Sequence, residues 1–148
     1  MTPTAELGGG GAVNLVRTAQ YFKVQVPDKP GEGARMLSVL RAANINLLAF
    51  SGFPRNRRAQ LDFVPEDPTV FLYAAKQAKW KVQKPKTCFV VNGDDRTGAV
   101  ADLMRKLAES RINVTAIDAV CAGQGRYGAL FWVKPRDVKK TANVLGIG

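Results

Sequence analysis

Alternating and helically spaced apolar residues predict the same series of elements twice along this chain. Residues 21–26 alternate like a half-buried strand, with Phe22, Val24 and Val26 on the apolar side. Residues 34–43 then space their apolar side chains as a helix with one apolar face does. Two strands, a second helix and a short fourth strand complete this copy, and are predicted at residues 45–53, 59–64, 68–79 and 80–83. The first copy therefore reads strand, helix, strand, strand, helix, strand.

A second copy follows 67 positions later and repeats polar residues as well as apolar ones. Asp28-Lys29-Pro30-Gly31 is matched by Asp95-Arg96-Thr97-Gly98, and Ile45-Asn46 is matched by Ile112-Asn113. Its strands and helices are predicted at residues 87–91, 99–110, 112–121, 127–133 and 136–144, with little room for a fourth strand. Two copies are too few for a solenoid, so they indicate a duplicated small domain.

The repeated element order predicts an α+β fold of two ferredoxin-like βαββαβ units in tandem. Each unit has an antiparallel sheet with its helices on one face. We expect the domains at residues 21–84 and 85–148. Residues 1–20 contain four consecutive glycines and read as a flexible leader, with room for a short extended segment at residues 12–16. Each unit of about 65 residues is marginal alone, so we expect the sheets to join or the units to pack together.

Period-2 and period-3.6 spacing predicts a separate core for each unit. The first core is expected to join the helix at residues 68–79 and to contain Phe22, Val24, Met36, Leu37, Leu40, Ile45 and Phe63. The equivalent second core is expected to contain Val91, Leu103, Leu107, Ile112, Val114 and Leu130.

Composition narrows the chemistry that the chain can perform. The sequence contains no histidine, which excludes Ser-His and Cys-His nucleophiles, histidine general bases and histidine-ligated metals. Cys88 and Cys121 form neither a disulfide framework nor a metal motif, and read as reduced, buried thiols of a cytoplasmic protein. No apolar run approaches the roughly 20 residues that span a bilayer. We therefore expect no enzyme, no metal, no cofactor and no membrane partner.

The net charge of +10 brings acidic partners, including nucleic acid, into consideration. Residues 126–132 are similar to the third strand of an RNA-recognition motif, in which aromatic side chains stack on bases. Tyr127 and Gly128 fit that pattern, but Ala129 stands where a second aromatic belongs. The basic residues are also dispersed. A basic ferredoxin-like RNA-binding module is therefore the alternative interpretation, and nucleic acid is the less expected partner.

The chain resembles the ACT domain family over residues 21–144. The resemblance rests on a strand, an Asp/Gly loop, an apolar helix and an Ile-Asn entry into the second strand, all occurring twice. ACT domains are βαββαβ modules that usually sense amino acids and regulate metabolism. The resemblance thus implies a non-catalytic regulatory protein that binds an amino acid, or a similar small zwitterion, where the two copies meet. An incomplete second sheet would leave an edge through which a homo-oligomer could form.

The repeated polar residues have the chemistry that a free amino acid needs. A loop carboxylate can hold the ammonium group, backbone N–H groups at a helix start can hold the carboxylate, and glycine permits close approach. The candidate ligand-binding residues are Asp28, Pro30, Gly31, Asn46, Asp94, Asp95, Gly98 and Asn113. The alternatives are that the aspartates cap helices, the glycines only make turns, and the asparagines only satisfy backbone. Two prolines stiffen the first loop, so we expect it to bind more strongly than the second.

Overall fold

The computed structural model describes residues 4–9 and 12–147 of the chain, which divides into two compact units. The first unit is Gln20–Lys86, and the second unit combines Met1–Ala19 with Thr87–Gly148. A single long strand, β2 (Ala12–Pro27), contributes its first half to the second unit and its second half to the first. Each unit therefore contains one half of β2.

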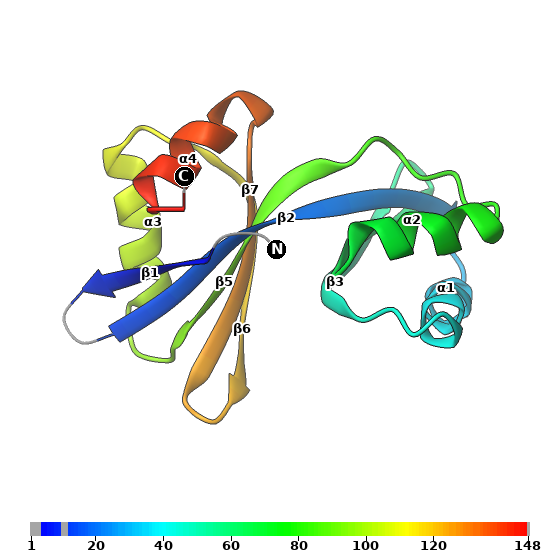
Figure 1. The fold of residues 1–148 in the computed structure, drawn as a ribbon, viewed down its shortest axis with the longest axis horizontal. Coiled ribbons are helices and arrows are strands. Elements are labelled where there is room, and N and C mark those ends of the chain that lie inside the picture. Colours follow the sequence, from blue (N-terminus) through cyan, green and yellow to red (C-terminus); the bar gives the residue numbers. More distant parts are fainter. Residues whose placement is uncertain (1–3, 10–11, 148) are drawn as a thin grey trace. The chain divides into compact units, whose positions relative to one another are not determined.

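The first unit is a small antiparallel sheet with two helices (Figure 1). Its strands are β3 (Leu47–Arg55), β4 (Arg58–Pro65) and the second half of β2, in the order β3-β4-β2. Its helices are α1 (Glu32–Ala42) and α2 (Pro68–Gln77). Asp67 caps α2 by accepting hydrogen bonds from the backbone N–H groups of Thr69 (3.0 Å) and Val70 (3.4 Å), and Pro68 occupies the first turn.

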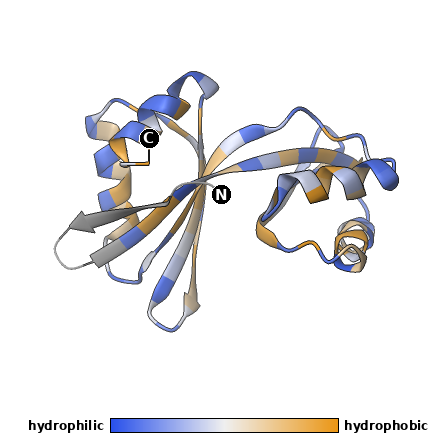
Figure 2. Cartoon of the chain, viewed as in Figure 1, coloured by the Kyte–Doolittle hydropathy of each residue, from blue (hydrophilic) through white to orange (hydrophobic). Residues whose placement is uncertain are grey.

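All seven side chains predicted for the first core belong to it. Figure 2 shows apolar and polar residues in succession along β2, and the apolar Phe22 and Val24 of this strand are buried in the core. Phe22, Phe63 and Phe71 are fully buried, and the Phe71 ring packs on the other two, with ring centroids 4.9 Å from Phe22 and 5.5 Å from Phe63. Leu37 and Ile45 are half-buried against this core.

The predicted fourth strand at residues 80–83 does not form as a strand. Residues 80–85 are irregular, although the Gln83 N–H donates to the Lys23 carbonyl of β2 at 3.1 Å. Pro85 lacks an N–H group and cannot extend that pairing. Trp80 instead packs on Phe63, with ring centroids 5.8 Å apart.

The second unit contains β5 (Lys86–Asp94), β6 (Val114–Gly123) and β7 (Arg126–Val133), with the first half of β2 beside β5. Its order is β2-β5-β7-β6, and β1 (Thr4–Gly9) pairs antiparallel with β2. Its helices are α3 (Ala99–Glu109) and α4 (Val138–Val144), the latter preceded by a 3₁₀ turn, η1 (Pro135–Asp137).

The fourth strand of the second unit is therefore supplied by residues 12–19, ahead of the first unit in the chain. The short extended segment expected at residues 12–16 forms as part of β2, and the prediction of a flexible leader was wrong for residues 4–9 and 17–19, which belong to β1 and β2. Val16 is fully buried in the second core, and the Cys88 thiol donates to the Ala19 carbonyl at 3.5 Å. The rest of the predicted leader includes residues 1–3, 10 and 11, which lie outside the described part.

Five of the six side chains predicted for the second core belong to it, and Leu130 does not. Ala129 and Phe131 point into the core, so Leu130 between them lies on the opposite face of β7. Both units nevertheless have the predicted α+β, ferredoxin-like arrangement of an antiparallel sheet and two helices, and that prediction of fold class is confirmed.

Candidate functional site

The junction between the first strand and first helix has the same backbone geometry in both units. Gly31 and Gly98 stand just before α1 and α3, with left-handed φ angles of +92° and +86°. The N–H of Arg35 donates to the Gly31 carbonyl and that of Asp102 to the Gly98 carbonyl, each at 2.9 Å. Neither helix receives a hydrogen bond from a capping side chain. The alternative that Asp28 and Asp95 cap these helices is therefore not what the structure shows.

In the first loop, Asp28 and Pro30 are exposed and the Asp28 carboxylate is open to a ligand. Within the described residues, no hydrogen bond or ion pair engages that carboxylate. The neighbouring Glu32 is committed to Arg35 (2.7 Å) and lies 3.8 Å from the Lys29 ammonium. The hydrogen bond from Arg35 is the main cause that lowers the pKa of Glu32. Asp28 is thus the loop carboxylate left for an external cation.

The second loop differs, because its carboxylates already have protein partners. Asp94 pairs with the Arg126 guanidinium, which also donates to Asn92 Oδ1 at 2.8 and 3.2 Å. Asp95 accepts a hydrogen bond from the Cys121 thiol, and this contact is the main cause that raises the pKa of Cys121. Cys121, which we expected to be buried, is exposed, whereas Cys88 is buried as predicted.

Arg96 of the second loop is also engaged. It pairs with Asp102 of α3, and its guanidinium is the main cause that lowers the pKa of that carboxyl. Arg105 adds a second contact to Asp102 at 3.3 Å. The two loops have the same backbone geometry. In the second loop, however, the charged groups that a ligand would contact already interact with neighbouring side chains.

Asn46 and Asn113 lie at the other ends of the helices from the loops. Helix α1 has 11 residues and spans about 16 Å, so Asn46 and Gly31 are on opposite sides of it. Asn46 donates to Glu66 Oε1 at 2.7 Å, and the Glu66 N–H donates to the Asn46 carbonyl at 3.1 Å. Within each unit, the structure does not bring the asparagine to the loop. Asn46 instead joins the segment after α1 to the segment before α2.

A shallow hollow of about 500 Å³ adjoins Asn46 in the first unit. It lies between α1 and the start of β3, and is lined by Leu37, Leu40, Arg41, Asn44, Ile45, Asn46 and Leu47. Sequence reasoning assigned Leu37 and Leu40 only to the core and missed Arg41, whose side chain is exposed and lies one helical turn after Leu37.

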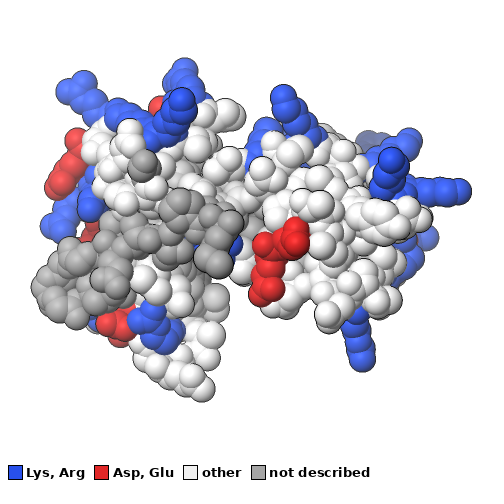
Figure 3. All heavy atoms as spheres, viewed as in Figure 1, with Lys and Arg blue, Asp and Glu red and all other residues white. Residues whose placement is uncertain are grey.

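The aromatic residues that suggested RNA binding are not available for stacking. Tyr127 is only 4% exposed, belongs to the second core and hydrogen-bonds Asn14 at 3.3 Å through its hydroxyl. Trp132 is likewise buried, at 7% exposure. In Figure 3, lysine and arginine side chains are distributed around the visible face instead of forming one continuous patch. This arrangement does not support the RNA-binding alternative.

The described part of the chain offers neither a cluster of metal ligands nor a helix that could span a membrane. There, no three acidic or cysteine side chains gather as metal ligands would. No helix among these residues is long and apolar enough to cross a membrane.

Comparison with solved structures shows what the fold is similar to. Protein BT0572 from Bacteroides thetaiotaomicron superposes with a TM-score of 0.76 at 19% identity, over 87% of each chain. The regulatory subunit of aspartate kinase from Thermus thermophilus gives 0.61 at 17% identity, over 93% of this chain and 95% of that one. A structure of aspartokinase alpha and beta subunits gives 0.57 at 21% identity, over 88% and 93%.

No family model matches the sequence, and neither does any curated protein. At identities near 20%, the structural likeness shows the fold. That fold is the one that the resemblance to ACT domains implies.

Proposed function

We propose that this chain is a regulatory protein without catalytic activity of its own, which binds an amino acid or a similar small zwitterion. The observation that carries the proposal is the open Asp28 carboxylate beside the uncapped start of α1. The two features offer opposite charges a few residues apart. A free amino acid presents the complementary pair of charges.

The chemistry of the first loop fits both ends of such a ligand. Asp28 would hold the ammonium group through a charge-assisted hydrogen bond. The first N–H groups of α1, which carry partial positive charge, would hold the carboxylate. An ideal Cβ built on Gly31 meets no atom within 4 Å, so the approach over this residue is free of protein. Pro30 restricts the loop and reduces the entropy lost on binding.

The structural relatives are compatible with a regulatory role. The Thermus thermophilus protein is described as a regulatory subunit of aspartate kinase, and this chain covers 95% of it. The lack of histidine in this sequence further limits the acid–base chemistry that the chain offers. We propose that the bound amino acid alters how this chain acts on another protein, as in a cytoplasmic sensor.

We also propose that the chain pairs with a second copy through a sheet edge. Strand β6 is an outer strand of its sheet, its side chains are mostly exposed, and Val120 is 67% exposed. Unprotected outer strands favour pairing with another chain. Light scattering on Val120→Lys and wild type tests this idea, since a lysine on the edge should shift a dimer toward monomer. A monomeric wild type would contradict it.

A thermal-unfolding screen of the twenty amino acids tests the binding proposal. A ligand at about 100 times its dissociation constant adds about 2.7 kcal/mol to the free energy of unfolding. We expect one or a few amino acids to raise the unfolding temperature, and their amides and decarboxylated amines to fail, because the site needs both charges. The proposal is contradicted if no amino acid stabilises the protein, or if the singly charged analogues stabilise it equally.

A further inference from the structure

A second group of charged side chains lies on the first unit, on the face of its sheet that carries no helix. Lys23 of β2 and Asp62 of β4 are cross-strand partners there, because Phe22 and Phe63 of the same strands point into the core. Asp62 is only 4% exposed, and its Oδ1 accepts a hydrogen bond from Gln60 Nε2 at 2.9 Å. Arg55 of β3 reaches the same group and donates to Gln60 Oε1 at 3.4 Å.

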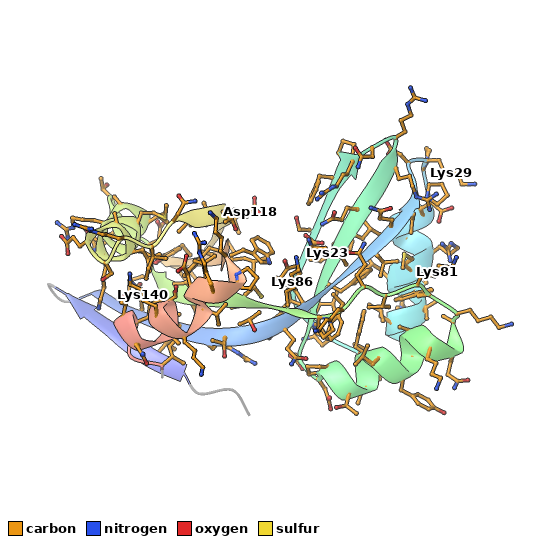
Figure 4. The ribbon with its side chains drawn as sticks, turned by 90° about the horizontal axis from the view of Figure 1, so that it is seen from above. Lys23, Lys29, Lys81, Lys86, Asp118 and Lys140 are labelled. Atoms are coloured by element: carbon orange, nitrogen blue, oxygen red, sulfur yellow. The ribbon has the colours of Figure 1, made fainter. Side chains whose placement is uncertain are left out.

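Lys86, the first residue of β5, completes the group. Its chain segment runs beside β2, where the Gln83 N–H donates to the Lys23 carbonyl. Strand β5 neighbours β2 in the sheet, so Lys86 lies on the strand beside that of Lys23. Figure 4 shows their side chains close together beside β2, with Lys81 in another part of the unit. Lys23 also lies 5.8 Å from the centre of the Tyr21 ring.

The group contains more positive charge than its own carboxylate can balance. Lys23 and Arg55 lie beside Asp62, and Lys86 adds a third cation next to Lys23. Burial, followed by the charge of Lys86, lowers the pKa of Lys23, while burial raises the pKa of Asp62. Like charges held this close cost free energy unless an opposite charge joins them. A bound anion would neutralise this excess of two positive charges.

We propose that Lys23, Arg55 and Lys86 form a binding site for a small dianion, a phosphate or a dicarboxylate. Lys23 and Lys86 would each donate to the anion, and the Arg55 guanidinium suits the paired oxygens of either class. Asp62 and Gln60 form the floor of the site and hold Arg55 and Lys23 in place. Because Asp62 already accepts from Gln60 and faces Lys23, an ammonium ligand would meet more cations than anions here. This site is separate from the amino-acid site proposed at Asp28.

Calorimetric titration of the full chain with inorganic phosphate, and separately with succinate, tests this site in a buffer of low ionic strength. We expect at least one of the two anions to bind at a single site, and the better binder identifies the ligand class. Lys23→Met and Lys86→Met should each weaken binding about tenfold or more, because each removes a charged donor. Lys81→Met is the matched control, since it removes an exposed lysine elsewhere on the same unit.

The Asp62→Asn variant tests whether the site binds anions or zwitterions. Removing the Asp62 carboxylate should tighten phosphate or succinate binding several-fold, since the anion no longer faces this like charge. The proposal is overturned if neither anion binds, if Lys81→Met weakens binding as much as Lys23→Met, or if Asp62→Asn weakens binding. Circular dichroism establishes folding of each variant, and Lys86→Met serves if Lys23→Met fails to fold. Amino-acid stabilisation should persist in Lys86→Met, so the two proposed sites can fail independently.

Discussion

Left-handed backbone at single glycines sets where α1 and α3 begin. Gly31 and Gly98 have φ angles of +92° and +86°, a region that costs an L-residue about 1–2 kcal/mol. These positions keep the loop carboxylates ahead of the helices without using them as caps. The open Asp28 carboxylate follows from this local geometry.

Substituting two nearby glycines should have opposite effects on stability. Gly31→Ala should lower the free energy of unfolding by about 1–2 kcal/mol through backbone strain, since no neighbouring atom obstructs the new methyl group. Gly33→Ala, inside α1 and equally unobstructed, should raise it by up to about 1 kcal/mol. Urea unfolding of both variants measures the difference. Equal effects would contradict the assigned backbone conformation.

Asp62 should make stability depend on pH in the direction opposite to most carboxylates. Burial raises its pKa in the folded state above the ordinary value of about 3.9, so the folded chain holds this proton more tightly than the unfolded chain. Its contribution to stability is therefore present at low pH and is lost as pH rises through the raised pKa.

Comparing wild type with Asp62→Asn isolates this contribution. The variant keeps an oxygen that can accept from Gln60 but does not ionise. The stability of Asp62→Asn relative to wild type should increase as pH rises from about 4. Urea unfolding at several pH values measures this difference. A difference that stays constant with pH would show that burial does not perturb Asp62.

Some residue roles were predictable from the sequence and others depended on strand register. The Asp-to-Gly loops were visible because they recur 67 positions apart beside apolar runs. The pairing of Lys23 with Asp62 was not visible, since only the register of β2 on β4 joins them. Asn46 looked like a loop partner in sequence, but the length of α1 separates it from Asp28.

At the scale of elements, β2 serves both units. Its first half lies beside β5 and serves as the fourth strand of the second unit's sheet. The sequence indicated the strand at residues 21–26 and a short extended segment at residues 12–16, but not that the two form one continuous strand. The glycine-rich stretch before it favoured a leader, and its partner β5 begins about 60 residues further along the chain. Local patterns do not encode such distant pairing.

Truncating buried Val16 tests whether residues 12–19 belong to the second core. Val16→Ala should lower the free energy of unfolding by about 2 kcal/mol, because it leaves a cavity among fully buried neighbours. Val70→Ala is the matched control on α2, where the side chain is 43% exposed, and should change stability by less than about 0.5 kcal/mol. Chemical denaturation compares the two. A negligible effect of Val16→Ala would place these residues outside the core.

At the scale of the whole molecule, duplication has preserved backbone while side chains diverged. Both units keep the left-handed glycine, the helix that follows it and an apolar core. In the second unit, Arg126 pairs with the Asp94 carboxylate and Cys121 interacts with that of Asp95. In the first unit, the Asp28 carboxylate has no partner among the described residues. The repeat was predictable because duplication copies sequence. The difference between the loops was not, because Arg126 and Cys121 approach from the distant β6–β7 hairpin. We infer that the first loop is the stronger binding site.

Calorimetric titration of the stabilising amino acid into wild type, Asp28→Ala and Asp95→Ala tests the central claim most directly. We expect Asp28→Ala to weaken binding about tenfold or more through loss of the ammonium partner, and Asp95→Ala to change it less than about threefold. Thermal unfolding of each variant controls for changes in fold stability. An amino acid that binds Asp28→Ala as tightly as wild type, or loses more affinity in Asp95→Ala, would contradict binding at the first loop.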